Sequence, residues 1–277
     1  MIKLSNEYLR VDVNSHGAEI CNVEYMGQKR LHDGVNFWQR TAPVLFPIVG
    51  GLIDNKYTHN GISYTMNQHG FARDMEFEIN QISETEAICV LTSNDETKTK
   101  YPFDFIFKIK YVLSSNILST SYIVENKSDE IMYYSVGAHP AYNIDFSKDV
   151  DILVGGSNEM YQLSKKGIVK RTDCIDNFKL DYSEFKNDAL IYSSLDDENF
   201  VNIKVDGKDF IRVEYTDMKQ LGLWTPLGVQ APFICIEPWV GMADLANRKD
   251  DLLSNKDFIN KLEINETKTC TYDTIFN

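Results

Sequence analysis

A glutamate in an apolar setting is the residue in this sequence with the clearest capacity for acid–base chemistry. Glu237 follows the uninterrupted apolar run Phe233 to Ile236 and precedes Pro238 and Trp239. A carboxylate is costly to bury unless it is paired or used in chemistry. Two interpretations are open: Glu237 is a general base, or it forms a buried salt bridge with an arginine such as Arg40.

A histidine held before a proline is the second candidate. In the segment Val136 to Asn143, the apolar stretch leads into His139 and Pro140. Proline biases the residue before it toward extended backbone geometry, which limits the mobility of the imidazole. A fixed imidazole can donate or accept a proton near neutral pH. The alternative is a histidine that is satisfied within the core and has no chemical role.

A proline-interrupted apolar segment is the third candidate. Residues 38–51 contain two prolines and end in two glycines, which predicts a loop or edge segment rather than a central strand. Such an apolar loop must pack down onto the protein. With Arg40 inside it and with His69 and Arg73 following, it could line a pocket. Alternatively, the two arginines pair with carboxylates.

Composition excludes several classes of partner. The chain has 277 residues, 43% of them hydrophobic, and its 28 basic and 41 acidic residues give a formal net charge of −13. Nucleic acids and anionic membranes are bound through Lys and Arg, so we expect neither as a partner. The N-terminus is polar, with no apolar run typical of a secretory signal, and a cytoplasmic location is expected. The sequence leaves the oligomeric state open.

The sequence predicts no metal centre and no cofactor site. Its five cysteines are an odd number, lie far apart and include no C-x-x-C pair, so reduced thiols are expected. No two of the five histidines are spaced as metal ligands. The sequence also lacks a G-x-S-x-G motif, a phosphate-binding loop and a dinucleotide fingerprint, which disfavours serine hydrolase, NTPase and Rossmann chemistry.

Alternation with period two dominates the chain and predicts a mostly β protein. Apolar residues alternate from Phe105 to Tyr111 and again from Leu118 to Val124, which predicts a long antiparallel hairpin. The dipeptides Asn60-Gly61 and Asp206-Gly207 predict two tighter hairpins. Helical periodicity is nearly absent. No linker or repeat divides residues 1–277, so we expect one domain, and a large sandwich is favoured over stacked barrels or a propeller.

These segments together resemble the aldose 1-epimerase (galactose mutarotase) family, and its LacX-like branch in particular. The apolar segment from Arg40 to Gly50, His69 to Arg73, Gly137 to Asn143, and Ile236 to Trp239 occur in the family's order and at about its spacing. The resemblance spans essentially the whole chain. It implies a large antiparallel β-supersandwich with a sugar bound in a cleft on one sheet, and a reaction that needs no cofactor.

The resemblance also implies roles for individual residues. Glu237 is similar to the family's general base, His139 to its general acid and His69 to its second active-site histidine. Arg40 is similar to an arginine that binds sugar hydroxyls, and Asp188 to an aspartate that contacts the substrate. The implied mechanism opens the ring and closes it from the other face, with Glu237 ionised and His139 protonated at the start.

Aromatic rings are expected to complete the sugar site, because the apolar face of a sugar stacks on them. The candidates lie in or near the motifs or at strand ends, and Phe71 and Trp224 are the strongest of them. Each ring could equally belong to the core. The full set of aromatic candidates is Trp38, Phe71, Tyr142, Trp224 and Trp239.

Three other functions remain open from the sequence. A hexose-6-phosphate 1-epimerase needs cations for the phosphate, which Arg40 and Arg73 could supply. A non-catalytic carbohydrate-binding or sensing protein could use the same fold. A glycosidase needs two carboxylates flanking the scissile bond, and only Glu237 can be nominated.

Overall fold

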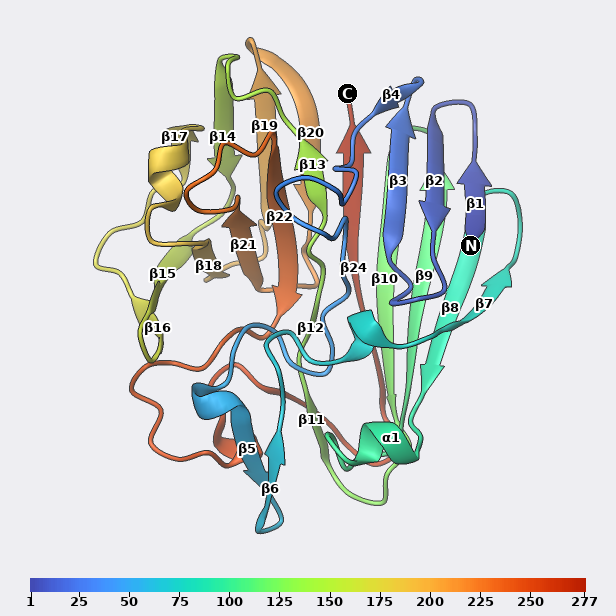
Figure 1. The fold of residues 1–277 in the computed structure, drawn as a ribbon, viewed down its shortest axis with the longest axis vertical. Coiled ribbons are helices and arrows are strands. Elements are labelled where there is room, and N and C mark those ends of the chain that lie inside the picture. Colours follow the sequence, from blue (N-terminus) through green and yellow to red (C-terminus); the bar gives the residue numbers. More distant parts are fainter.

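The computed structural model covers residues 1–277, and its largest sheet contains the long predicted hairpin (Figure 1). All of the strand pairings in this nine-stranded sheet are antiparallel. In spatial order its strands are β17 (Asn177–Lys179), β14 (Val150–Val154), β19 (Phe200–Val205), β20 (Lys208–Glu214), β24 (Thr267–Phe276), β10 (Ile117–Asn126), β9 (Phe105–Ser114), β8 (Glu86–Thr92) and β7 (Glu78–Gln81).

A seven-stranded antiparallel sheet forms the second large layer. Its order is β12 (Val136–Gly137), β22 (Phe233–Val240), β21 (Gln220–Trp224), β18 (Leu190–Ser194), β15 (Asn158–Ser164) and β16 (Gly167–Lys170), with β13 (Ala141–Asn143) also paired to β22. The smaller sheets are β1 (Ile2–Ser5) with β2 (Leu9–Val13), β3 (Ile20–Tyr25) and β4 (Gln28–Lys29); β5 (Lys56–His59) with β6 (Ile62–Thr65); and β11 (Met132–Tyr134) with β23 (Asn260–Leu262).

The turn residues explain the hairpins. Asn60-Gly61 joins β5 to β6 and Asp206-Gly207 joins β19 to β20, and all four residues have positive φ, as a tight hairpin turn requires. The long hairpin of β9 and β10 is paired from Ser114 with Ile117 to Phe105 with Asn126. All three predicted hairpins are confirmed, as is the mostly antiparallel β class.

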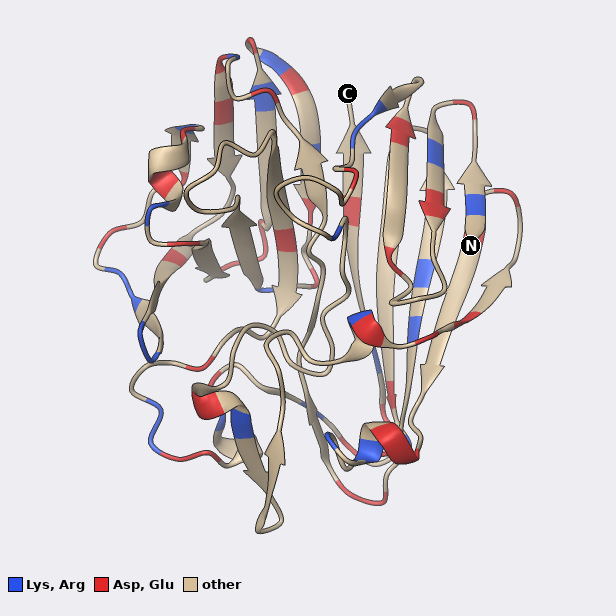
Figure 2. Cartoon of the chain, viewed as in Figure 1, with Lys and Arg blue, Asp and Glu red and all other residues tan.

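Helical structure is limited to single turns. The helix α1 (Asp95–Lys98) is capped by Asn94, whose side chain accepts a hydrogen bond from the Thr97 amide. Four 3-10 turns complete the set: η1 (Ile53–Asn55), η2 (Ala72–Asp74), η3 (Tyr182–Phe185) and η4 (Leu253–Asn255). No helix in the structure has the length and apolar character that crossing a membrane demands. In the view of Figure 2, basic residues are interspersed with acidic ones and gather into no basic face.

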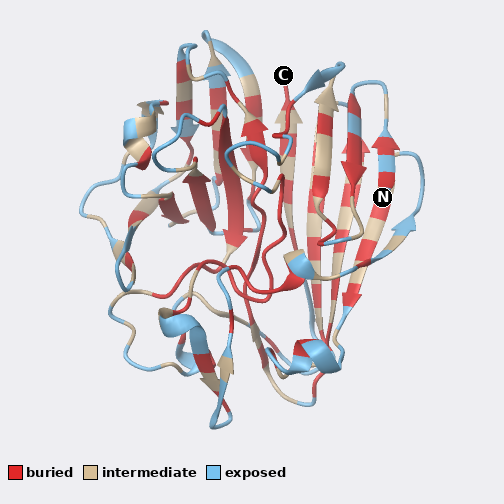
Figure 3. Cartoon of the chain, in the orientation of Figure 1, coloured by how far each residue is buried: buried red, intermediate tan, exposed pale blue.

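Strand pleating assigns one face of the seven-stranded sheet to the core and the other to the site. In β22, Ile234 and Ile236 belong to the large hydrophobic cluster, together with Val201 and Val213 of the nine-stranded sheet. Alternate residues of a strand point to opposite faces. Glu237 and its alternate neighbours therefore point away from this shared core. Figure 3 shows buried positions on the strands of both sheets and on the loops that cross the centre of the view.

The apolar segment at residues 41–50 is a buried loop, as the sequence predicts. The carboxylate of Glu19 accepts hydrogen bonds from the amides of Thr41 (2.7 Å) and Ala42 (2.9 Å) at one end. Farther along, the amide of Leu45 donates to the carbonyl of Gly137 (2.9 Å), and the Gly137 amide donates back (3.0 Å). The loop is therefore fastened to the strand that leads to His139.

Phe71 belongs to the core and does not line the site. Its side chain is 5% exposed and packs edge-on against Phe46, with Tyr101 and Phe105 also close. The prediction that Phe71 stacks on a sugar is therefore wrong. The backbone turns between His69 and Phe71, at Gly70 (φ 72°), and the two side chains point into different environments.

Replacing Phe71 with alanine should therefore act on stability. Truncation of a buried phenylalanine leaves a cavity and typically costs about 3–5 kcal/mol of unfolding free energy. Phe37, which is 53% exposed, gives a matched control, because Phe37→Ala should change stability by no more than about 0.5 kcal/mol. Urea denaturation of both variants measures this difference. If both variants lost the same free energy of unfolding, the packing of Phe71 in the core would not contribute more to stability than the exposed Phe37.

Candidate active site

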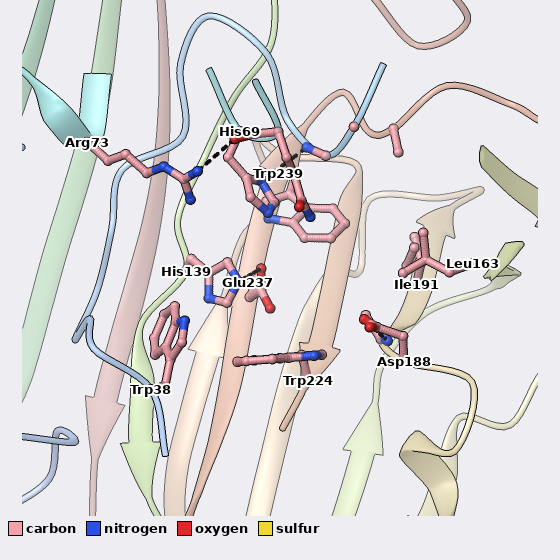
Figure 4. Close-up of a pocket in the computed structure, with 15 residues that line it drawn as sticks. Trp38, His69, Arg73, His139, Leu163, Asp188, Ile191, Trp224, Glu237 and Trp239 are labelled. Carbon is pink, nitrogen blue, oxygen red and sulfur yellow. Dashed lines mark hydrogen bonds and ion pairs between the residues drawn. The ribbon is translucent and has the colours of Figure 1, made fainter. Parts of the chain in front are cut away.

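A pocket of about 290 Å³ lies on the outer face of the seven-stranded sheet (Figure 4). This volume is near the lower end of the range for small-molecule sites, about 300–1,000 Å³. Strands β15, β18, β21 and β22 contribute to it, and loops close it. The residues that line it are Trp38, Gly50, Gly51, Gln68, His69, Arg73, His139, Leu163, Asp188, Ala189, Ile191, Trp224, Glu237, Trp239 and Ala243.

His139 and Glu237 face each other on the floor of this pocket, with Nε2 of the histidine 3.2 Å from a carboxylate oxygen of the glutamate. The backbone enforces this pairing. Strands β12 and β13 both pair with β22, and His139 lies in the short interruption between them. On either side of it, the Ala138 amide donates to the Pro238 carbonyl (3.0 Å) and the Ile236 amide donates to the Pro140 carbonyl (3.2 Å).

Burial determines how this pair holds its protons. Glu237 is 1% exposed and His139 is 8% exposed. Desolvation raises the pKa of Glu237 well above its usual value, and the nearby Asp188 carboxylate adds to the effect. Desolvation also lowers the pKa of His139 to about 3. Burial therefore favours a neutral imidazole and a protonated carboxyl in this pair. The ionised Glu237 and protonated His139 of the predicted starting state would need a proton transfer between them.

His69 is held as a neutral hydrogen-bond donor. Its Nδ1 accepts a hydrogen bond from the Gly50 amide (3.1 Å), and its own amide donates to the Gly50 carbonyl (2.9 Å). A nitrogen that accepts carries no proton, so the proton of the neutral ring is on Nε2. Burial, with His139 and the arginines nearby, lowers the pKa of His69 well below its usual value. Its ring lies perpendicular to that of His139, 5.6 Å away.

All three tryptophans of the chain line this one pocket. The ring of His139 lies 4.9 Å from that of Trp38 and 5.6 Å from that of Trp224, and the two indoles meet edge-on. Trp239 donates from Nε1 to the Ala138 carbonyl (3.2 Å). The prediction names Trp224 as the strongest tryptophan candidate, and the structure adds Trp38 and Trp239 as lining residues. Tyr142 is buried and bonds Thr274 instead.

Arg73 lines the pocket, whereas Arg40 lies behind it. Arg73 donates to the Gln68 carbonyl (2.8 Å). Arg40 forms a 2.6 Å ion pair with Asp74, lies 3.9 Å from Glu19, and is not among the lining residues. The prediction that Arg40 binds sugar hydroxyls is therefore not supported. Arg40 instead pairs with carboxylates, which was the alternative interpretation of its role. Its proposed salt bridge to Glu237 is wrong, because Glu237 faces His139.

Asp188 does reach the pocket, and in Figure 4 it lies on the side of Trp224 away from Trp38. It has positive φ (74°), which aspartate tolerates better than most residues. The lining residues that were not predicted as site residues include Leu163 on β15, Ile191 on β18 and Gln68. At Leu163 and Ile191 the sequence shows only the period-two alternation of a strand. That alternation does not reveal which face of the strand lines a pocket.

A buried ion cluster supports the wall that contains Ala243. The carboxylate of Asp244 accepts from Arg248 (2.6 Å) and from the Ile53 amide (2.9 Å), and Lys256 lies 3.5 Å away. The Asp244 amide donates to the Gly51 carbonyl (3.0 Å). Asp244 thus ties the loop after β22 to the glycines that position His69. Sequence spacing gave no indication of this cluster.

The fold and the pocket define a β-sandwich protein with a buried histidine–glutamate pair in a cavity of about 290 Å³. The comparisons agree. Residues 1–244 match the family model described as Aldose 1-epimerase. Protein LacX of Lactococcus lactis subsp. lactis, in its plasmid form, is 28% identical over 304 residues, which cover 100% of this chain and 99% of the relative.

Solved structures show the same architecture. A galactose mutarotase related enzyme from Lactobacillus acidophilus is 30% identical, with a TM-score of 0.94 and coverage of 100% of this chain and 97% of that one. The galactose 1-epimerase from Lactobacillus acidophilus NCFM is 14% identical with a TM-score of 0.71, covers 99% of this chain and 93% of its own, and shares the fold. The chain therefore belongs to the aldose 1-epimerase family, and the predicted LacX-like branch and supersandwich fold are confirmed.

Two glycines make room for the tryptophan under the pocket. A Cβ built on Gly222 would lie 2.5 Å from the Trp239 ring, and one on Gly137 would lie 2.4 Å from it. We expect Gly222→Ala to cost about 1–3 kcal/mol of stability through overpacking and to shift the tryptophan fluorescence. Gly51→Ala is the matched control, because its Cβ meets nothing within 4 Å. If urea titrations show that both variants are as stable as the parent, Trp239 is not tightly packed against Gly222.

Proposed function

We propose that this protein interconverts the α and β anomers of a hexose by opening and reclosing the sugar ring. The observation that carries the proposal is the buried His139–Glu237 pair, 3.2 Å apart, on the floor of a pocket lined by three tryptophans. Ring opening needs one group to take the proton of the C1 hydroxyl and another to protonate the ring oxygen. Two adjacent groups that exchange a proton can do both.

The pair changes its protonation without a change of net charge. Transfer of the proton from Glu237 to His139 across their contact converts the neutral state that burial favours into a carboxylate and an imidazolium. Hydrogen bonds from sugar hydroxyls stabilise the carboxylate and lower its pKa. Glu237 then takes the C1 proton while His139 gives its proton to the ring oxygen. Closure on the other face reverses both transfers, and no cofactor is required.

The other lining groups would bind and orient the sugar. His69 would donate from Nε2 to an oxygen of the sugar, since its Nδ1 is already occupied by the Gly50 amide. Asp188 would accept from hydroxyls, and Arg73 would donate to them. The indoles of Trp38 and Trp224, which flank His139, would stack on the apolar face of the ring.

A phosphorylated hexose is the second candidate substrate. Arg40 and Arg73 support it less than expected, because Arg40 is paired with Asp74. A cavity of about 580 Å³ adjoins the pocket, however, and is lined by Lys165 and Lys166 from the turn between β15 and β16. Two ammonium groups at this position would suit a phosphate that extends out of the pocket.

The carboxyl group of Glu237 should be essential for turnover. We expect Glu237→Gln to lower kcat by about 10²- to 10⁴-fold, the usual contribution of a positioned acid or base. Sugar affinity, measured by quenching of the pocket tryptophans, should change far less. Glu130→Gln is the matched control, because Glu130 also contacts a histidine, His59 (3.1 Å), outside the pocket. Polarimetry of freshly dissolved α-anomers measures turnover.

Either of two results would contradict this assignment. A Glu237→Gln variant as active as the parent would remove the proposed base. A parent protein that binds sugars without accelerating mutarotation would favour the non-catalytic carbohydrate-binding protein.

The protein should accept hexoses that carry no phosphate as substrates. We expect glucose or galactose to be anomerised faster than in the absence of protein, and Lys165→Ala with Lys166→Ala to leave that rate within about twofold. Parallel assays with glucose 6-phosphate decide between the two candidates. A rate enhancement confined to the phosphorylated sugar and lost in the lysine variants would assign the protein as a hexose-6-phosphate 1-epimerase.

A further inference from the structure

A buried thiol lies beside the acid–base pair, and the proposed reaction makes no use of it. Cys235 precedes Glu237 by two residues on β22, so the pleat points both side chains to the same face. Cys235 is 0% exposed and is paired in register with Ala141 on one side and Trp224 on the other. The thiol therefore lies under the floor of the pocket.

Three different donor atoms converge at this point. One ligand atom each from His139, Cys235 and Glu237 lies within 4.8 Å of the other two. The His139–Glu237 separation is 3.2 Å. The carboxylate oxygen that faces His139 is buried and, apart from this 3.2 Å contact, has no hydrogen-bond partner. Unsatisfied buried acceptors are rare in native proteins, so this oxygen is available to a cation.

We propose that His139, Cys235 and Glu237 form a binding site for a thiophilic divalent cation, with zinc as the best match, and that the cation inhibits the protein. Zinc binds nitrogen, sulfur and carboxylate oxygen at about 2.0–2.3 Å in tetrahedral geometry, which places neighbouring ligand atoms about 3.3–3.8 Å apart. Small side-chain adjustments bring the three donors to this spacing. Magnesium and calcium prefer all-oxygen sites and match this donor set poorly.

Inhibition follows from which groups the cation holds. Coordination needs the thiolate, so the thiol proton leaves to solvent, and any proton shared by Glu237 and His139 leaves with it. The carboxylate and the imidazole then bind the metal and can no longer transfer protons to a sugar. Because Cys235 has no exposed surface, the cation must enter through the pocket and compete with the sugar.

This site differs from a resident metal centre. The sequence predicts no metal cofactor, and the proposed reaction requires none. The cation would act as a reversible inhibitor that captures three side chains present for other reasons. Metal binding needs only the geometry of these side chains, whereas the inhibition rests on the proposed function.

Direct binding tests the site independently of activity. We expect the purified, metal-stripped protein to bind one equivalent of cobalt(II) with a thiolate-to-cobalt charge-transfer absorption, and zinc to displace it. Cys235→Ala should abolish that absorption and weaken zinc binding at least tenfold, measured by competition with a chromophoric chelator. Cys89→Ala is the matched control, because Cys89 is a buried cysteine in the nine-stranded sheet. Cys235→Val serves if the alanine variant does not fold.

Polarimetry supplies the second readout. Zinc should raise the apparent KM for the sugar, and a chelator should restore it. The absence of a charge-transfer band in the parent, or equal zinc affinity in the parent and in Cys235→Ala, would overturn the site. Stoichiometric metal binding by a protein that shows no mutarotation would leave the site standing and would overturn only the proposed function.

Discussion

The structure depends on the burial of one carboxylate, that of Glu237, beside one imidazole. An ionised carboxylate in an apolar setting is strongly disfavoured unless it is paired or neutralised. Here desolvation favours the protonated carboxyl of Glu237 and also drives His139 toward its neutral form. In this state, one proton transfer from Glu237 to His139, whose facing atoms are 3.2 Å apart, would convert the neutral pair into an ion pair. The sandwich and its loops leave Glu237 only 1% exposed and His139 only 8% exposed.

Two other carboxylates, of the partly buried Glu19 and the buried Asp244, hold the loops that enclose the pair. Glu19 binds the amides at the start of the 41–50 loop, and Asp244 joins the loop after β22 to the segment around Gly51. Each satisfies backbone donors that a loop packed over a sheet would otherwise leave unpaired. The loop then presents Gly50 to His69, which fixes the histidine's tautomer. The carboxylates of Glu19 and Asp244 therefore hold the loops around the pair that is proposed to do the chemistry.

Much of this arrangement could be predicted from the sequence, because it lies in local patterns. Period-two alternation and turn dipeptides determine the hairpins, and Glu237 and His139 stand out because each follows an apolar run and precedes a proline. The failures have one physical cause. Phe71 and Arg40 lie in the right segments, but proximity along the chain does not determine which way a side chain points. Leu163 and Ile191 were missed because an apolar strand residue that faces a ligand looks like one that faces the core.

The same strand pleat underlies both the proposed acid–base pair and the proposed cation site. Placing Glu237 on the outer face of β22 necessarily places Cys235 on that face, beside Trp224. A small apolar residue such as alanine would fill a similar position without offering a ligand. The thiol remains inert while burial holds its pKa well above the usual value. Only a cation that bonds to sulfur strongly enough to displace that proton can make use of it. The burial that favours the neutral forms of Glu237 and His139 therefore also keeps the Cys235 thiol protonated.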